Sequence, residues 1–265
     1  MQQKTYPPRR LARPQKLVQL TDCHLYADPD AVHKGVRPGR TLEHVLRHIA
    51  RRHSDLKALL LTGDLSEDES AASYEWLKRS VLQFGVPVYA IPGNHDNSQR
   101  MHAAFAGQIG IGGTIGLSHW KIYLLDSTVP GETAGLLAQQ ELDRLRQELQ
   151  RFPVTPTLVV LHHHPVPVGS AWMDRLGLRN GKALNSLLLQ HPQVKAVAFG
   201  HIHQEFLENT GSVLYLGTPS TCIQFRPGSP LYAPDNLPPA CRVFNLRGDG
   251  IFDTHVEYVP VPAKR

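Results

Sequence analysis

The chain has 265 residues, of which 41% are hydrophobic and 19% charged, so it can bury a large core and is not a disordered chain. No apolar run approaches the ~18 residues of a membrane helix. The net charge is +5, and five basic residues precede the first acidic one, which leaves 23 basic and 23 acidic residues in the remainder. We therefore expect a flexible basic arm over residues 1–16 and a single folded domain over residues 17–265.

The basic start of the sequence and its charge distribution also indicate where the protein is located and which partners it binds. The basic, proline-containing start lacks the apolar core of a secretory signal, so we expect a cytoplasmic protein without a membrane partner. A nucleic-acid partner is not expected, because a binder of this kind usually carries its positive excess on the folded surface. The number of subunits does not follow from the sequence.

Five short apolar runs each end in a cluster of Asp, Asn or His beside Gly or Pro. Such runs, about four to eight residues long, predict buried strands whose two faces are covered. The runs are LVQL before TDCH (21–24), ALLL before TGD (62–64), VYAI before PGNHD (92–96), LVVL before HHHP (162–165) and AVAF before GHIH (200–203).

Helical periodicity marks the segments between these runs. Apolar residues repeat at helical spacing within residues 42–49, 74–81, 142–149 and 183–188. Ser66 and Glu69 have the spacing of a capping box ahead of the second of these helices. Alternating strands and helices predict an α/β fold with a largely parallel sheet.

The pattern changes after residue 210. The segments SVLYLG, CRVFNL and IFDTHVEYV have strand character, and we expect them to be antiparallel strands that complete a second sheet. Residues 219–240 are rich in proline and lack periodicity, which predicts a long irregular loop of the kind that often carries function.

The five clusters contain seven side chains that can bind metal ions. Ligands of open α/β sheets bind beyond the carboxyl ends of strands, so we expect the clusters to meet at one sheet rim. Residues two apart point the same way in an extended chain, which would pair Asp22 with His24 and His201 with His203. One catalytic ion takes three or four protein ligands, so seven predict two ions that share a carboxylate. The seven are Asp22, His24, Asp64, Asn94, His162, His201 and His203.

Asp64 is the expected bridging carboxylate, because Gly63 allows a sharp turn that brings it to the rim. Imidazole, carboxylate and amide donors without a thiolate suit iron or manganese, with zinc as an alternative. A single cluster of this kind is also explained by a turn or a helix cap. Only the occurrence of all five clusters together is specific for a metal site. We expect His163 and His164 to support a ligand or contact substrate, His33 to be packed or solvated, and Cys23 to lie in the core.

In this order the motifs resemble the signature of the calcineurin-like metallophosphoesterase superfamily, from Asp22 to His203. Within it, LHHHPVPVGSAWMDRLGLRN (161–180), GHIHQE (200–205) and TPSTCIQF (218–225) are similar to bacterial class III 3′,5′-cyclic nucleotide phosphodiesterases. The resemblance implies a sandwich of two mixed β-sheets flanked by helices.

The resemblance also implies roles for single residues. Asp22, His24 and His203 would bind one metal ion, Asn94, His162 and His201 the second, and Asp64 would bridge them. Alignment on Pro165 selects His162 from the three consecutive histidines. The implied reaction is hydrolysis of 3′,5′-cyclic AMP to 5′-AMP by a metal-bridging hydroxide, with His95 and Asp64 as catalytic residues. The implied substrate contacts are His24, Asp64, Asn94, His95 and His203.

Recognition of the base is less determined by the sequence. Candidates in or near the irregular loop are Phe225, Arg226 and Tyr232, and further candidates are Trp172 and Arg175. Two other functions stay open at this point: a broad phosphodiesterase or phosphomonoesterase that acts on 2′,3′-cyclic nucleotides or other phosphoesters, and a non-catalytic interaction module.

Overall fold

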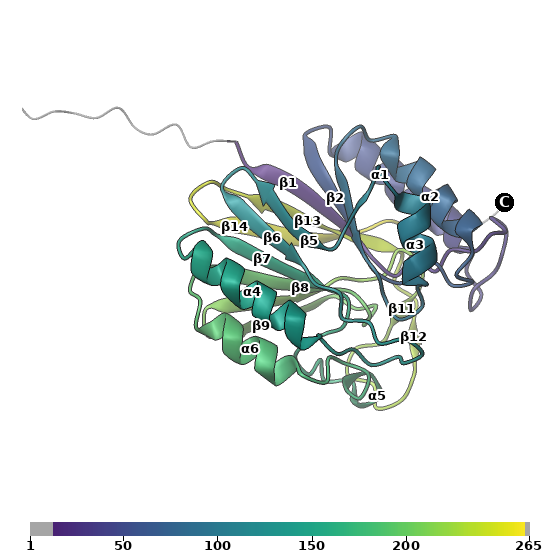
Figure 1. Cartoon of the computed structure of the whole chain (residues 1–265). Coiled ribbons are helices and arrows are strands. Elements are labelled where there is room, and N and C mark those ends of the chain that lie inside the picture. Colours follow the sequence, from purple (N-terminus) through teal and green to yellow (C-terminus); the bar gives the residue numbers. More distant parts are fainter. Residues whose placement is uncertain (1–12, 263–265) are drawn as a thin grey trace, which may run out of the picture.

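The computed structural model describes residues 13–262, in which two six-stranded sheets pack face to face between two layers of helices (Figure 1). This arrangement is the sandwich that the resemblance implied. Residues 1–12 of the predicted basic arm lie outside the described residues. The first strand, β1 (Gln15–Leu20), begins within the last two residues of that arm.

The first sheet holds three of the five predicted strands at its centre. From edge to edge it consists of β14 (Phe252–Tyr258), β13 (Ala240–Leu246), β1, β2 (Leu56–Thr62), β3 (Val88–Ile91) and β4 (Gly110–Ile111). Strands β1 to β4 are parallel, and β13 and β14 are antiparallel additions beside β1.

The second sheet holds the other two predicted strands as neighbours. It consists of β5 (Gly113–Leu117), β6 (Trp120–Leu124), β7 (Thr157–Leu161), β8 (Val194–Phe199), β10 (Val213–Gly217) and β9 (Phe206–Thr210). Strands β6, β7, β8 and β10 are parallel, and β5 and β9 are antiparallel edges. The irregular loop contains a short antiparallel pair, β11 (Gln224–Phe225) and β12 (Pro234–Asp235).

The strands after residue 210 pair differently from the prediction. We expected antiparallel strands that complete a second sheet, and β10 is antiparallel to β9, but it also runs parallel to β8 in the second sheet. The hairpin of β13 and β14 instead extends the first sheet beside β1. Period-two patterning identifies a strand and its buried face, whereas the choice of partner depends on which sheet edge is open when the chain returns to it.

The helices cover the two outer faces of the sandwich. In Figure 1, α1 (Pro38–Arg52), α2 (Ala71–Leu82) and α3 (Ser98–Phe105) lie against the first sheet, and α4 (Gln139–Arg151) and α6 (Gly181–Leu189) against the second. A short helix, α5 (Ala171–Asp174), lies near β11 and β12. No helix within residues 13–262 is long and apolar enough to cross a membrane.

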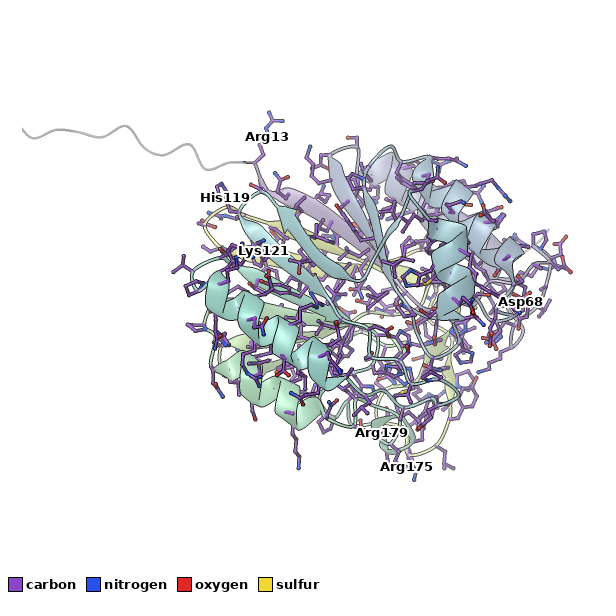
Figure 2. The ribbon with its side chains drawn as sticks, in the orientation of Figure 1. Arg13, Asp68, His119, Lys121, Arg175 and Arg179 are labelled. Atoms are coloured by element: carbon purple, nitrogen blue, oxygen red, sulfur yellow. The ribbon has the colours of Figure 1, made fainter. Side chains whose placement is uncertain are left out.

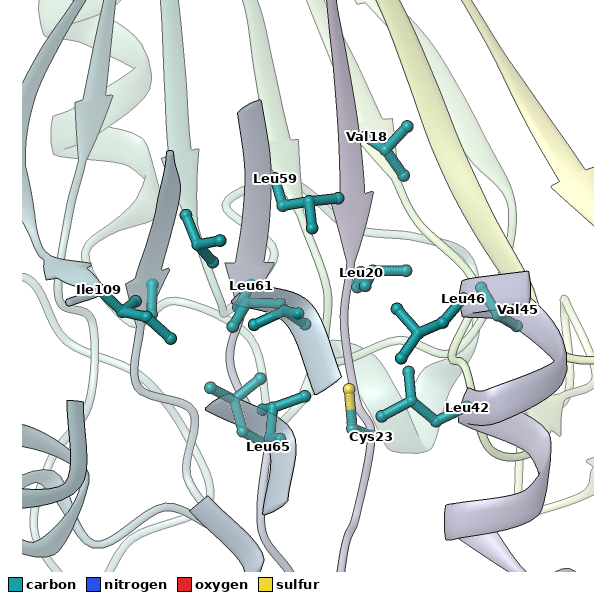
Figure 3. Close-up of a cluster of buried hydrophobic side chains, with 14 of the residues drawn as sticks. Val18, Leu20, Cys23, Leu42, Val45, Leu46, Leu59, Leu61, Leu65 and Ile109 are labelled. Atoms are coloured by element: carbon teal, nitrogen blue, oxygen red, sulfur yellow. The ribbon is translucent and has the colours of Figure 1, made fainter. Parts of the chain in front are cut away.

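Apolar stripes of the helices form the outer cores. Leu42, Val45 and Leu46 of α1 pack against strand residues of the first sheet, as Figure 3 shows. Cys23 lies in this cluster and is fully buried, so its predicted place in the core is confirmed.

The start of α2 differs from the prediction. The N-cap is Ser70, whose hydroxyl accepts a hydrogen bond from the backbone N–H of Ser73 at 3.1 Å, so the capping box of Ser66 and Glu69 is wrong. Ser66 still belongs to the loop that follows β2, where its hydroxyl contacts Ser73. The helix therefore starts four residues later than the motif indicated.

A chain of buried polar groups links the two sheets. The guanidinium of Arg242 donates to the hydroxyl of Thr218, and that hydroxyl donates to the side-chain carbonyl of Gln19 at 2.7 Å. The Gln19 amide in turn donates to the hydroxyl of Thr62 at 2.8 Å. Buried polar groups of this kind are stabilising only when each has a partner, so the chain fixes the ends of β1 and β2 relative to β10.

Leu60 provides a test of the inter-sheet packing. Its side chain is fully buried between the sheets, so Leu60→Ala is expected to lower the free energy of unfolding by about 2–5 kcal/mol. Val154→Ala, at a position that is 88% exposed, is the control and should change stability by less than about 0.5 kcal/mol. Urea denaturation of the two variants measures both values, and a loss below 1 kcal/mol at Leu60 would contradict this packing.

Candidate metal centre

All five predicted clusters meet at one end of the sandwich, but they do not share the rim of one sheet. Three follow β1, β2 and β3 of the first sheet, and two follow β7 and β8 of the second. The seven predicted ligand residues thus gather where the carboxyl ends of two sheets face each other. Potential donor atoms in this region form overlapping groups in which all atoms lie within 4.8 Å of one another.

The backbone at these positions is left-handed and not extended as predicted. Asp22, His24, Asp64, His201 and His203 all have φ between 48° and 67°. Among residues 13–262 only eight non-glycine residues have positive φ, and five of them are predicted ligands. Such conformations cost about 1–3 kcal/mol each and persist where the surrounding structure imposes them. The tight turns therefore aim the side chains of these pairs inward, and strand alternation does not.

Glycines allow the turns to approach each other. A Cβ atom at Gly63 would collide with the ring of His162, and one at Gly93 would collide with the carboxylate of Asp64. A Cβ atom at Gly200 would collide with the hydroxyl of Thr21. The prediction that Gly63 permits a sharp turn is confirmed by its φ of 93°.

Asp22, His24 and His203 form the first donor group. The Nδ1 atom of His203 lies 2.8 Å from the carbonyl of Ile223, and Nδ1 of His24 lies 2.7 Å from a carboxylate oxygen of Glu67. Both partners only accept hydrogen bonds, so each Nδ1 donates and each Nε2 of the neutral ring keeps a lone pair. These two Nε2 atoms lie 3.2 Å apart, and that of His203 lies 3.2 Å from Asp22. Acceptors this close repel unless a cation or a proton lies among them, so the group fits a metal ion.

Asp64, Asn94, His162 and His201 form the second group. His162 donates from Nδ1 to the carbonyl of Thr62 at 2.8 Å, and its Nε2 lies 3.3 Å from both Asp64 and the side-chain oxygen of Asn94. The buried Nε2 of His201 has no hydrogen-bond partner among residues 13–262. This second group, too, consists of groups that can face a cation.

The structure distinguishes the three consecutive histidines. Both ring nitrogens of His163 have partners, the hydroxyl of Ser127 at 2.8 Å and the carbonyl of Thr133 at 3.1 Å. His164 lies 3.9 Å from the carboxylate of Asp174 and has two ring nitrogens without hydrogen bonds among residues 13–262. Among the three, His162 has an Nε2 that lies 3.3 Å from both Asp64 and Asn94, and it stays the candidate ligand that the alignment on Pro165 selects.

The charges of the centre follow from these contacts. Burial alone would raise the pKa values of Asp22 and Asp64, but His203 beside Asp22 and His162 beside Asp64 outweigh it and lower both pKa values. Burial opposes protonation of His162, yet attraction by Asp64 raises the pKa of His162 to about 9. Without metal ions, this imidazolium balances part of the carboxylate charge.

Glu67 is a central residue that the sequence analysis missed. One carboxylate oxygen lies 2.7 Å from Nδ1 of His24 and 3.1 Å from Nδ1 of His95, so a single side chain orients two predicted site residues. Burial opposes protonation of His95, but its contact with Glu67 and attraction by Asp64 raise the pKa of His95 to about 9. The only sequence signal was the position of Glu67, three residues after Asp64.

Asp96, the last residue of the Gly-Asn-His-Asp motif, joins two of the turns. Its carboxylate accepts backbone hydrogen bonds from Leu65 and Ser66 after β2, and from Gly93 after β3. It thereby holds the turn of Asp64 against the turn of Asn94. His33, expected to be packed or solvated, is packed: its ring stacks on that of His24 with centroids 5.1 Å apart.

A cleft of about 120 Å³ opens beside the metal-binding groups. Five of the seven predicted ligands line it, namely His24, Asp64, Asn94, His201 and His203, and so does His95. The fully buried side chains of Asp22 and His162 do not line it. Of the five base-recognition candidates, Trp172, Phe225 and Tyr232 line it. Arg226 is exposed and does not line it, and Arg175 lies at the outer edge of the molecule beside α5 (Figure 2).

Comparison with known proteins identifies relatives over almost the whole chain. Residues 15–205 match the family model of the calcineurin-like phosphoesterases. The 3′,5′-cyclic adenosine monophosphate phosphodiesterase CpdA of Pseudomonas aeruginosa is 40% identical over 243 residues, which is 92% of this chain and 89% of that protein. CpdA of Escherichia coli K12 is 35% identical, over 91% of this chain and 88% of its own.

Solved structures share the fold at low identity. A dimetal phosphatase from Danio rerio superposes with a TM-score of 0.67 and 13% identity, over 94% of this chain and 100% of its own. A purple acid phosphatase from yellow lupin gives a TM-score of 0.70 and 10% identity, over 96% of this chain and 52% of its own. At these identities the comparison supports the two-sheet architecture alone.

The contact between Glu67 and His95 can be tested in metal-free protein. Glu67→Gln removes the charge that favours the imidazolium, so the pKa of His95 should fall from about 9 toward its ordinary value of about 6.5. Because the raised pKa is a property of the folded state, the stabilisation by protonated His95 is complete below pH ~6.5 and lost as the pH rises through about 9. Titration of the imidazole by NMR measures the pKa, and Glu75→Gln on the surface of α2 is the control. A pKa that stays near 9 in Glu67→Gln would assign the shift to Asp64 instead.

Proposed function

The chain belongs to the calcineurin-like phosphoesterase family, and on this premise we propose that it hydrolyses 3′,5′-cyclic AMP to 5′-AMP in a metal-dependent reaction. The observation that carries the proposal is the convergence of seven metal-binding side chains from five strand ends beside an open cleft. Relatives named as cyclic AMP phosphodiesterases are 35–40% identical over about nine tenths of the chain, which supports the choice of substrate.

Two divalent cations fit the donor groups. Asp22, His24 and His203 would hold one ion, and Asn94, His162 and His201 the other, with Asp64 shared between them. Bound ions of this kind supply Lewis-acid stabilisation of phosphoryl oxygens and lower the pKa of a water molecule that attacks phosphorus. We propose iron or manganese, with zinc as the alternative, because the donors are imidazole, carboxylate and amide without a thiolate.

The side chains around the ions have separate tasks in this proposal. Thr62, Ile223 and Glu67 hold the imidazoles of His162, His203 and His24 in the orientation that presents Nε2 to a cation. His24, Asp64, Asn94, His95 and His203 line the cleft and would contact the phosphodiester.

His95 is the proposed general acid. Its side chain is 40% exposed and lines the cleft, and in the metal-free protein its contact with Glu67 outweighs burial and raises the pKa of His95 to about 9. It can therefore donate a proton to the departing ribose 3′-oxygen, which is a poor leaving group without one. Glu67 fixes the ring through Nδ1, so Nε2 is the proton donor.

We also propose that the enzyme acts in the cytoplasm on a small cyclic nucleotide. All three cysteines are free and buried, as suits a reducing compartment.

Turnover of a substrate series tests the function. Purified enzyme loaded with manganese or iron is expected to hydrolyse 3′,5′-cyclic AMP with a higher kcat/KM than 2′,3′-cyclic AMP or an aryl phosphodiester. Asp64→Ala should lose both activity and metal, measured by elemental analysis, because it removes the shared ligand. A higher kcat/KM for the other esters would favour a broad phosphoesterase, and fewer than one ion per wild-type chain would favour a non-catalytic module.

His95→Ala separates proton donation from metal binding. Turnover of cyclic AMP is expected to fall by about 10²–10⁴-fold while both metal ions remain bound. His102→Ala, at an exposed position of α3, is the matched control and should retain wild-type turnover. Loss of metal in His95→Ala would show that His95 supports the ligands and is not the acid.

A further inference from the structure

Three aromatic rings form one wall of the cleft beyond the metal-binding groups. They belong to Trp172 in α5, Phe225 in β11 and Tyr232 in the irregular loop. The ring centroids lie 5.2–5.5 Å apart in pairs and the planes meet at 68–80°, so each ring packs its edge against another. We call these three side chains the aromatic wall.

The aromatic wall is directly connected to the metal-binding groups. Phe225 stacks on the imidazole of His203 with centroids 4.1 Å apart and planes 7° apart. A phosphodiester held at His203 would therefore lie beside the wall. The base of a nucleotide is joined to its phosphate through one ribose, so the wall lies within its reach.

Lys34 lies over the aromatic wall. Its Nζ is 4.9 Å from the ring centroid of Tyr232 and 5.8 Å from that of Phe225, within the range of cation–π contacts. Lys34 belongs to a tight turn in which His33 and Val36 exchange backbone hydrogen bonds of 2.7 and 2.9 Å. Its φ of 48° is left-handed although it is not glycine, so the turn imposes this conformation and fixes where the side chain starts.

One feature of the wall is not accounted for by packing. Tyr232 is 45% exposed although it lines the cleft, so part of its ring is available to a ligand. The indole N–H of Trp172, in contrast, is buried and has no surface that a ligand in the cleft could reach. Trp172 therefore contributes its ring to the wall and not its N–H.

We propose that Trp172, Phe225, Tyr232 and Lys34 form the subsite for the nucleobase of the cyclic nucleotide. The base stacks on the exposed part of Tyr232, and the Lys34 ammonium donates to an acceptor atom on its edge. This inference rests on the proposed function and adds to it the residues that distinguish a nucleotide from other phosphodiesters.

The test compares two substrates that differ only in the base. Cyclic AMP is measured against methyl β-D-ribofuranoside 3′,5′-cyclic phosphate, which keeps the sugar and the cyclic diester. Tyr232→Ala is expected to raise KM for cyclic AMP about 10-fold, as loss of one base–aromatic stack does, without raising KM for the base-free ester. Tyr232→Phe, which keeps the ring, should restore most of the affinity. Lys34→Met should raise KM in the same selective way.

Leu231→Ala is the matched control in the same loop. Leu231 is 71% exposed and does not line the cleft, so this variant should match the wild-type protein with both substrates. Calorimetry adds a readout without turnover: the wild-type protein should bind 5′-AMP more tightly than ribose 5-phosphate, and Tyr232→Ala should lose about 10-fold of that preference.

The outcomes separate this inference from the function on which it rests. Equal KM increases for both substrates, or an unchanged AMP preference in Tyr232→Ala, would overturn the subsite while cyclic AMP hydrolysis stands. A wild-type enzyme that hydrolyses other phosphoesters but not cyclic AMP would overturn the proposed function and the subsite together.

Discussion

The site depends on how closely the turns at the ends of five strands approach one another. At Gly63, Gly93 and Gly200 a single Cβ atom would collide with a side chain from another turn. This crowding brings Asp64 and His162, which come from different sheets, to within 3.3 Å. Wider turns would leave the same residue types on two separate sheet edges, where no cation could be shared.

Hydrogen-bond acceptors around the site then determine which ions or groups the site can bind. Carbonyls of Thr62 and Ile223 and the carboxylate of Glu67 take the Nδ1 protons of three histidines. When these rings are neutral, the opposite nitrogens present lone pairs beside Asp22 and Asp64, whose lowered pKa values keep the two carboxylates ionised. A buried cluster of lone pairs and negative charges is stable only when protons or metal cations lie among them. Five of the candidate ligand residues keep a strained, left-handed backbone in this cluster.

The two ends of the cleft are built from different kinds of structure. The candidate metal-binding groups follow central strands of the two six-stranded sheets. The buried side-chain hydrogen bonds that run from Arg242 to Thr62 hold the backbone of these strand ends in place. The aromatic wall and Lys34 belong to loops, to a short helix and to the small pair of β11 and β12, all outside the two six-stranded sheets. The sequence of a loop can change without disturbing the sheets. This division therefore allows the phosphate chemistry to stay constant while a change in the loops alters which group is recognised beside the phosphate.

The sequence by itself determined the strands that end in candidate ligand residues, the apolar stripes of the helices and the seven candidate ligands that meet at one end of the sandwich, because these features are local patterns of residue type and spacing. Only the tertiary structure placed the clusters on two sheets, joined the hairpin of β13 and β14 to β1, and gave Asp22 and His24 their left-handed backbone. It also showed that Glu67 contacts both His24 and His95. Contacts between segments far apart in the chain arise from packing, so local patterns of residue type do not specify them.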